Sequence, residues 1–530
     1  MLEFLMLTGF IIITCILFNK FSNRIGVPML LTFIILGMVF GEDGIFKINF
    51  NNYFAAEVIC SIALVFIIFY GGFGTRWEEA KSVSVKAILT ATLGVVLTAA
   101  ITGMFCFFVL KIDLIESFLI GSVLSSTDAA SVFSILKGKK LSLKYKTDSM
   151  IELESGSNDP FAYMLTTIFL TISSGIDFEN IFLMLFKQIL IALVLGYIIA
   201  KLSMWFLKKI SNEDNGFDSI FVTAVAILSY AIPSYLGGNG YLSTYIVGII
   251  LGNSKIINKK GLVNFFDGIT ALMQILIFFL LGLLVSPTEL ANRPLTSMLI
   301  ALFITFVARP VSVFAILKPF KSPKNQIILF AFAGLRGAAS IVFSILVITS
   351  GHKTNMDIFH ITFFIVLFSI FIQGGFLPHV AKKLDMIDSE KNISKTFSDY
   401  VDEVPVQFIE LEVDSKHNWK DKLIRDINIP QDLLLALISR NDERIIPNGN
   451  TKILEGDIII LSAKAVNQSK HENKLYEIFV DKNHKWSNKL IQDIGLSKAL
   501  IVLVKRDSQA IVPRGNTLIL PDDVLVINEV

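Results

Sequence analysis

The sequence of 530 residues contains few charged residues, and this scarcity is confined to one part of the chain. Charged residues make up 17% of the total, whereas a typical soluble domain contains about 25%. The segment from Leu384 to Val530 carries 43 of the 92 charged residues, so only 49 fall in the first 383 residues. We therefore predict a long membrane-embedded part followed by an ordinary soluble tail.

Other absences exclude several classes of protein. The three cysteines lie in apolar runs without metal-ligand spacing, so neither a disulfide framework nor a transition-metal site is expected. A net charge of +2 gives no reason to expect a nucleic-acid partner. The tail lacks a Gly-x-Gly-x-x-Gly motif after a strand, which argues against an NAD-binding module. The sequence contains no nucleophile–base pair of the kind that would indicate an enzyme.

Thirteen apolar segments in the first 383 residues approach the length of about 20 residues that a membrane-spanning helix needs. They cover approximately residues 3–19, 27–42, 53–74, 87–110, 114–136, 149–173, 180–207, 218–236, 240–254, 267–286, 296–317, 326–349 and 359–381. Alternate loops are basic, near residues 20–24, 76–86, 137–146, 208–209, 255–260 and 318–324. Because basic loops stay in the cytoplasm, we expect a multi-pass inner-membrane protein with its N-terminus outside and its tail inside.

The thirteen segments permit an inverted repeat. Segments one to six and eight to thirteen would form two six-helix halves of opposite orientation, as in many secondary transporters. In this pairing the fifth and twelfth segments correspond, and small and polar residues interrupt both, at 121–128 and 334–340. We expect two interrupted helices that cross at a substrate site. The alternative is close helix packing through small residues.

Four charged residues lie deep within predicted membrane segments, where a charge costs at least about 2.5–3.5 kcal/mol and indicates function. They are Asp128 in the fifth segment, Glu154 and Asp159 in the sixth, and Arg336 in the twelfth. Arg336 needs a buried counter-ion, and we predict that Glu154 forms a structural ion pair with it. Asp159 is then the free carboxylate. Arg309, a fifth charge, receives no predicted role.

A free carboxylate in the membrane can exchange a proton for a cation. A buried carboxyl group favours its protonated form, whereas a nearby cation favours the charged form. The predicted site for a monovalent cation comprises Asp159, Asn158, Ser155, Thr127 and Asp128. Hydroxyl and carbonyl groups would supply the neutral oxygens that a hard cation prefers. Asp128 is either a direct ligand or a cap on the N-terminus of a half-helix.

Three motifs resemble the monovalent cation:proton antiporter family, in its NhaP-like branch. They are Thr127-Asp128-Ala129-Ala130, Glu154 through Asp159, and Gly334-Leu335-Arg336-Gly337. The resemblance covers roughly residues 1–383 and implies a homodimer whose core domain moves against a dimerisation domain. It implies Asp159 as the carboxylate that binds cation and proton. Related electrogenic members carry two adjacent aspartates, but Asn158 stands in the first position here, which resembles the electroneutral branch.

The tail contains two copies of one sequence unit. His417-Asn418-Trp419 recurs as His484-Lys485-Trp486, and Pro447-Asn448-Gly449-Asn450-Thr451 recurs as Pro513-Arg514-Gly515-Asn516-Thr517. Each copy reads as a strand, a short amphipathic helix and β-branched strands with a glycine turn. We predict a membrane domain at 1–383, a linker at 384–404, and two small cytoplasmic α+β domains at 405–464 and 472–530.

Each unit resembles the RCK-C or TrkA-C regulatory module of potassium transport systems. The second copy departs from this pattern where Asp522 replaces the glycine of the terminal turn. The resemblance implies dimerising domains that bind a small regulatory ligand such as a cyclic dinucleotide. A dimerisation clamp without a ligand is the alternative, and no other cofactor is expected.

These features together predict a secondary active antiporter that exchanges K⁺ for H⁺, one for one, under control of its tail. Potassium is favoured because the tail resembles modules of potassium transport systems. This preference rests on association and not on the residues of the ion site. Na⁺/H⁺ exchange by the same mechanism is the close alternative, and a ligand-gated cation channel is a third. The expected partners are K⁺ or Na⁺, H⁺, membrane lipid and a second copy of the chain.

Overall fold

The computed structural model describes residues 2–25, 29–138, 141–175, 178–210, 215–254, 256, 259–290, 294–352, 354–388, 406–415, 417–430, 433–440, 443–464, 474–482, 484–494, 499–506, 509–511 and 513–529. The chain divides into two compact units, Met1–Ser394 and Lys395–Val530. Several basic loop residues and most of the predicted linker at 384–404 lie outside the described residues.

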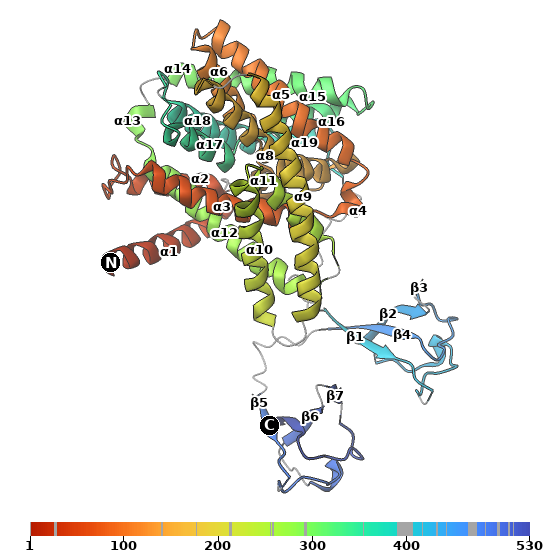
Figure 1. The fold of residues 1–530 in the computed structure, drawn as a ribbon. Coiled ribbons are helices and arrows are strands. Elements are labelled where there is room, and N and C mark those ends of the chain that lie inside the picture. Colours follow the sequence, from red (N-terminus) through yellow and green to blue (C-terminus); the bar gives the residue numbers. More distant parts are fainter. Residues whose placement is uncertain are drawn as a thin grey trace. The chain divides into compact units, whose positions relative to one another are not determined.

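The first unit is helical (Figure 1). Its helices are α1 (Leu2–Ile25), α2 (Met29–Phe40), α3 (Tyr53–Gly74), α4 (Trp77–Ala80), α5 (Ser84–Phe108), α6 (Leu114–Val123), α7 (Ala129–Gly138), η1 (Lys144–Lys146), α8 (Thr147–Ser173), α9 (Phe178–Ile210), α10 (Asn215–Tyr235), α11 (Gly240–Gly252), α12 (Lys259–Leu284), α13 (Pro287–Leu290), α14 (Pro294–Phe303), η2 (Ile304–Ala308), α15 (Arg309–Leu317), α16 (Lys324–Phe332), α17 (Ala338–Thr349), α18 (Ile358–Phe368), η3 (Ser369–Gly374) and α19 (Gly375–Lys383).

Within the described residues, seven helical stretches are long and apolar enough to cross a membrane. The described residues also form five shorter apolar helices, which include α2, α6, α11 and α17. Each of the thirteen predicted segments overlaps one or more helices. The shorter lengths arise partly because two predicted segments are broken in the middle, one between α6 and α7 and the other between α16 and α17.

Close helix contacts in this unit depend on glycine. A Cβ atom on Gly37 of α2 would lie 2.2 Å from the carbonyl oxygen of Phe279 on α12. A Cβ atom on Gly248 of α11 would lie 2.4 Å from the carbonyl oxygen of Phe69 on α3. Helices in membranes associate through such small residues because no hydrophobic force drives them together. Packing through small residues therefore operates here, in addition to the interrupted helices.

Two π-helical turns widen the helices before prolines. The turn η2 precedes Pro310, and the N–H of Arg309 donates to the carbonyl of Ile304, five residues earlier. The turn η3 precedes α19, which contains Pro378. Proline lacks the N–H that the α-helical ladder needs, and an inserted π turn is a common local adjustment, frequently at functional sites. The side chain of Arg309 is thereby rotated relative to a regular helix.

The chain leaves the helical unit through a short antiparallel pairing. Leu143 and Ile387 form an isolated β-bridge, in which the N–H of Lys144 donates to the carbonyl of Met386 and the N–H of Asp388 donates to the carbonyl of Ser142. Leu143 and Met386 are fully buried. The segment after α19 is therefore joined to the loop that leads into α8.

Each tail copy forms a four-stranded antiparallel sheet. The strands of the first are β1 (Val406–Glu412), β2 (Leu433–Arg440), β3 (Glu443–Ile445) and β4 (Ile458–Lys464), and those of the second are β5 (Lys474–Phe479), β6 (Ala499–Arg506), β7 (Gln509–Ile511) and β8 (Val524–Glu529). The strand orders β1-β4-β2-β3 and β5-β8-β6-β7 are equivalent. The predicted amphipathic helix is wrong: the described residues there form single 3₁₀ turns, η4 (Ile424–Asp426) and η5 (Ile491–Asp493).

A buried ion pair recurs in both sheets. Asp457 is fully buried and accepts two hydrogen bonds from Arg440, at 2.7 and 2.8 Å. Asp523 accepts two from Arg506, at 2.8 Å each. Burial alone would raise the pKa of Asp457, but the hydrogen bonds from Arg440 and from the N–H of Leu454 outweigh it and hold that pKa below its ordinary value. The repeated pair shows that the second copy keeps the structural framework of the first.

Candidate ion-binding site

Two unwound segments cross in the middle of the helical unit. The α6–α7 break spans residues 124–128, and the α16–α17 break spans residues 333–337. The N–H of Asp128 donates to the carbonyl of Leu335 over 2.7 Å, which joins the two breaks directly. A Cβ atom on Gly337 would lie 2.4 Å from the Cβ of Asp128, so the crossing leaves no room for a side chain there. Both predicted interruptions are therefore present, and the two breaks lie against each other.

The carboxylate of Asp128 caps the start of α7. Its Oδ1 accepts the N–H of Ala130 over 2.9 Å, and its Oδ2 accepts the hydroxyl of Ser131. A negative charge at a helix N-terminus offsets the positive end of the helix dipole. Of the two alternatives predicted for Asp128, this geometry corresponds to the cap.

Arg336 binds the opposite end of the same break. Its Nη1 donates to the carbonyls of Ser125, at 3.1 Å, and Ser126, at 2.7 Å. These carbonyls follow the C-terminus of α6, where the helix dipole is negative and a cation is stabilising. Arg336 is 2% exposed, so carbonyl dipoles compensate its charge inside the protein.

The prediction that Glu154 pairs with Arg336 is wrong, because another arginine occupies that position. Glu154 pairs with Arg309, whose Nη2 lies 2.9 Å from Glu154 Oε1, and both side chains are 2% exposed. The π turn before Arg309 brings that residue towards α8, and its guanidinium also lies over the ring of Phe330. Arg309, for which no role was predicted, is thus the counter-ion of Glu154.

Asn158 and Thr127 extend this ion pair into a network. The hydroxyl of Thr127 donates to Glu154 Oε2 over 3.1 Å, while Asn158 Nδ2 donates to Thr127 Oγ1 and, over 3.3 Å, to Glu154 Oε1. Asn158 is fully buried, and its Oδ1 has no hydrogen-bond partner among the described residues. Both oxygens of Glu154 are therefore occupied, and Asn158 presents one unused acceptor.

Ser155 holds the first unwound segment against α8. Its hydroxyl donates to the carbonyl of Thr127 and accepts the N–H of Ala129, each over 2.8 Å. These two bonds use the hydroxyl group, so Ser155 in this structure positions the backbone of Thr127. A hydroxyl that accepts one hydrogen bond retains a second lone pair, so the role of Ser155 as a neutral oxygen ligand stays a prediction.

Asp159 stands apart from the other two carboxylates. The hydroxyl of Ser126 donates to its Oδ1, and no lysine, arginine or histidine of the described residues forms an ion pair with it. Ser126 lies within the small polar run at 121–128, but nothing in the sequence distinguished it from the neighbouring serines. The crossing thus places the Ser126 hydroxyl on the carboxylate of Asp159, for which no ion pair is found among the described residues, and the next residue along the chain, Asn158, belongs to the Glu154 network.

A helical membrane unit in which two broken helices cross at buried charges is the architecture of a secondary transporter. Residues 9–383 match the family model described as "Sodium/hydrogen exchanger, transmembrane". The chain therefore belongs to the sodium/hydrogen exchanger family. It is a secondary transporter and not an enzyme, as the sequence predicted. Residues 408–471 and 475–527 each match the model described as "TrkA-C domain".

Similar proteins cover most of the chain. The "K(+)/H(+) antiporter NhaP2" of Shewanella baltica (strain OS223) is 32% identical over 464 residues, which are 86% of this chain and 80% of that protein. The "K(+)/H(+) antiporter NhaP" of Alkalimonas amylolytica is 31% identical over 468 residues, 87% of this chain and 81% of that protein. The structure of the sodium proton antiporter MjNhaP1 from Methanocaldococcus jannaschii at pH 8 has a TM-score of 0.63, is 23% identical, and covers 72% of this chain and 99% of its own. The helical fold is thus NhaP-like.

Proposed function

We propose that this protein exchanges one monovalent cation, preferably K⁺, for one proton at the carboxylate of Asp159. The observation that carries the proposal is that Asp159 lies at the helix crossing and has, among the residues that the structure describes, only the Ser126 hydroxyl as a hydrogen-bond partner. A carboxylate without a counter-ion in the membrane must be neutralised by something. A proton and a metal cation are the two species that can do so in turn.

The other buried charges argue for electroneutral exchange. Glu154 is neutralised by Arg309, and the Asp128 carboxylate is committed to the start of α7. Asn158, beside Asp159, carries no charge. One carboxylate accepts either one proton or one monovalent cation, so each cycle moves one of each and no net charge.

Potassium is preferred over sodium because relatives that are about 32% identical over most of the chain are named K⁺/H⁺ antiporters. The similar structure carries the name of a sodium proton antiporter, so Na⁺/H⁺ exchange is the second candidate. Neutral oxygens at the crossing, including Asn158 Oδ1, would complete the coordination of either ion.

The wider arrangement is proposed from the sequence pattern. Thirteen spans form two inverted six-helix halves, with the N-terminus outside, the basic loops and the tail in the cytoplasm, and a homodimer as the functional unit. Alternation of basic loops supports the orientation, and the crossed breaks support the inverted repeat.

The two tail sheets are proposed to regulate exchange by binding a small cytoplasmic ligand, with a cyclic dinucleotide as the first candidate. The matches of both copies to the TrkA-C domain support this role. Equilibrium dialysis of the full chain against a labelled cyclic dinucleotide tests it. Absence of saturable binding would leave the tail as a dimerisation clamp.

Everted membrane vesicles with a pH-sensitive dye test the transport reaction. Addition of KCl to vesicles containing the wild-type chain is expected to release protons, more strongly than NaCl at equal concentration. Asp159→Asn is expected to abolish the response to both salts. Asp267→Asn is the matched control, because Asp267 on α12 bonds to the hydroxyl of Tyr70 and not to the crossing.

Two outcomes would contradict the proposal. If the Asp159→Asn protein still moves protons when cation is added, Asp159 is not the exchange site. If the purified protein in liposomes generates a membrane potential during exchange, the stoichiometry is not one for one. Cation flux in the Asp159→Asn protein at unchanged rate, without proton movement, would favour the channel.

A further inference from the structure

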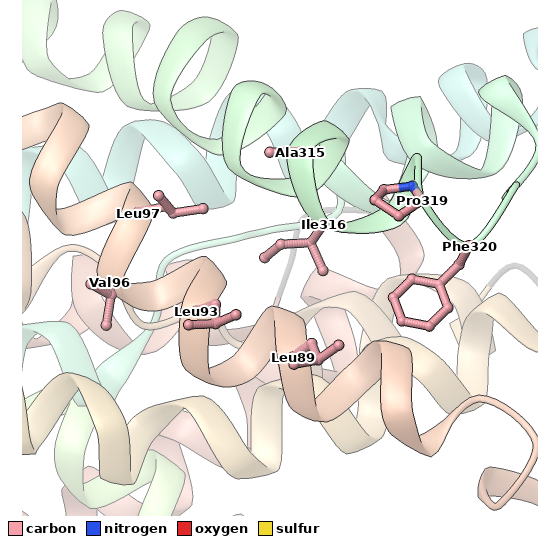
Figure 2. A pocket seen from close by; sticks show the side chains of 8 residues that line it. All are labelled: Leu89, Leu93, Val96, Leu97, Ala315, Ile316, Pro319 and Phe320. Carbon is pink, nitrogen blue, oxygen red and sulfur yellow. The ribbon is translucent and has the colours of Figure 1, made fainter.

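An apolar groove lies on the outside of the helical unit, away from the helix crossing. Its volume is about 430 Å³, and it is lined by α5 and by the end of α15 with the turn that follows (Figure 2). The lining residues are all apolar: Leu89, Leu93, Val96, Leu97, Ala315, Ile316, Pro319 and Phe320. Leu93 and Val96 are 54% and 45% exposed, so the groove opens to the surroundings.

Close packing of the two helices forms the floor of the groove. A Cβ atom on Gly94 would lie 3.3 Å from Cδ1 of Ile316, and the hydroxyl of Thr98 donates to that of Ser312 over 3.1 Å. The helices therefore touch beneath the opening, while the larger side chains of α5 rise on one side of it. On α9, by contrast, Leu193 is exposed and is not among the residues that line this groove.

One end of the groove is basic. Lys86 precedes Leu89 and Leu93 by three and seven residues, so it lies on the same face of α5. Its Nζ lies 3.1 Å from the hydroxyl of Ser322, which links α5 to the turn after α15. Lys318 and Lys321 are exposed on that turn. The sequence contains no aspartate or glutamate at 80–112 or 290–356, so no acidic residue of these segments offsets the lysines.

We propose that this groove binds one anionic phospholipid, with an acyl chain along Leu93 and Leu97 and the phosphate at Lys86 and Ser322. Basic pockets between membrane helices recognise anionic head groups, and the combination of a concave apolar surface with a basic end fits both parts of such a lipid. A lipid of the general bilayer needs neither feature. The proposal does not depend on which cation the protein exchanges.

Native mass spectrometry of the full chain in mild detergent tests this site. Phosphatidylglycerol and phosphatidylcholine with the same acyl chains are added in parallel. The wild-type chain is expected to retain one phosphatidylglycerol in preference to phosphatidylcholine. Lys86→Gln should reduce that retention about fivefold, as expected for one basic residue near an anionic head group. Leu93→Trp, which fills the groove, should remove the retained lipid.

Matched controls come from α9. Lys208→Gln removes an exposed lysine at the end of that helix, and Leu193→Trp enlarges an exposed residue outside the groove. Neither should change lipid retention. Equal retention of the two lipids by the wild-type chain, or retention of phosphatidylglycerol unchanged by both Lys86→Gln and Leu93→Trp, would overturn the proposal. Should Lys86→Gln fail to elute as a folded protein, Lys318→Gln tests the same basic end.

Discussion

Replacement of Arg309 by methionine is the sharpest test of the charge arrangement in the membrane. Arg309 Nη2 and Glu154 Oε1 are 2.9 Å apart, and both side chains are 2% exposed. Removing one partner of a buried ion pair costs about 3–5 kcal/mol, because the other charge is left uncompensated. Arg336→Met, by contrast, loses hydrogen bonds to two carbonyls but leaves the pairing of Glu154 intact.

A double-mutant cycle separates the two arginines. Combined with Glu154→Gln, Arg309→Met should show a coupling energy of at least about 2 kcal/mol, since the second change removes the stranded charge. The cycle with Arg336→Met should give a smaller coupling than the cycle with Arg309→Met, because Arg336 makes no direct contact with Glu154 and acts on it only through space.

Unfolding in a dodecyl sulfate titration supplies the energies. The three free cysteines are buried, so their modification by a thiol-reactive dye reports opening without an added label. A coupling of Glu154 to Arg336 larger than its coupling to Arg309 would refute the assignment made from the structure. Equal and small couplings would show that neither pair contributes to stability.

Three further predictions concern glycine, turn strain and pH. Gly337→Ala should abolish transport, because its Cβ would lie 2.4 Å from that of Asp128. Gly71→Ala should be tolerated, because a Cβ there would meet nothing within 4 Å. Dye-based vesicle assays compare the two variants, and an active Gly337→Ala protein would contradict the crossing. Asp522 adopts a positive φ of 70°, which glycine tolerates better than aspartate, so Asp522→Gly should stabilise the second sheet by about 1 kcal/mol. Hydrogen exchange measures this change, and reduced protection of the amides of the sheet would contradict the strain. The paired arginine lowers the pKa of Asp457, so its stabilisation is fully present above an unfolded pKa of about 4 and is lost as the pH falls from there through the folded value. Asp457→Asn should therefore cost less stability at pH 3 than at pH 7, and equal costs at both would refute this.

Much of the fold was predictable because membrane helices must satisfy their own backbone in lipid. Long apolar runs therefore mark the helices, and each predicted segment overlaps helical structure. The two breaks were also visible, since small and polar residues interrupt apolar runs at matching positions. The helix that the sequence suggested in each tail copy was wrong, because the backbone N–H groups of Ile424 and Ile491 donate to Thr451 and Thr517 and not to a helical turn of their own. Only single 3₁₀ turns of 3 residues form there.

The candidate site was only partly predictable. Residue types and depth identified Glu154, Asp159 and the two broken segments, but spacing along the chain cannot tell which of two buried arginines reaches Glu154. That choice depends on the π turn before Arg309, which rotates the side chain out of the regular helical position. The contact between Ser126 and Asp159 was missed for a similar reason, since an unwound segment has no fixed period from which side-chain direction follows.

The bridge between Leu143 and Ile387 determines where the transport unit can be cut from its tail. A truncation after Lys383, at the end of the last helix, would remove the segment that pairs with residues 142–144 and expose the buried side chain of Leu143. Backbone donors and acceptors ahead of α8 would lose their partners at the same time. A shortened protein that ends after Asp388 keeps this pairing, so it is the one whose activity reports on the tail sheets alone.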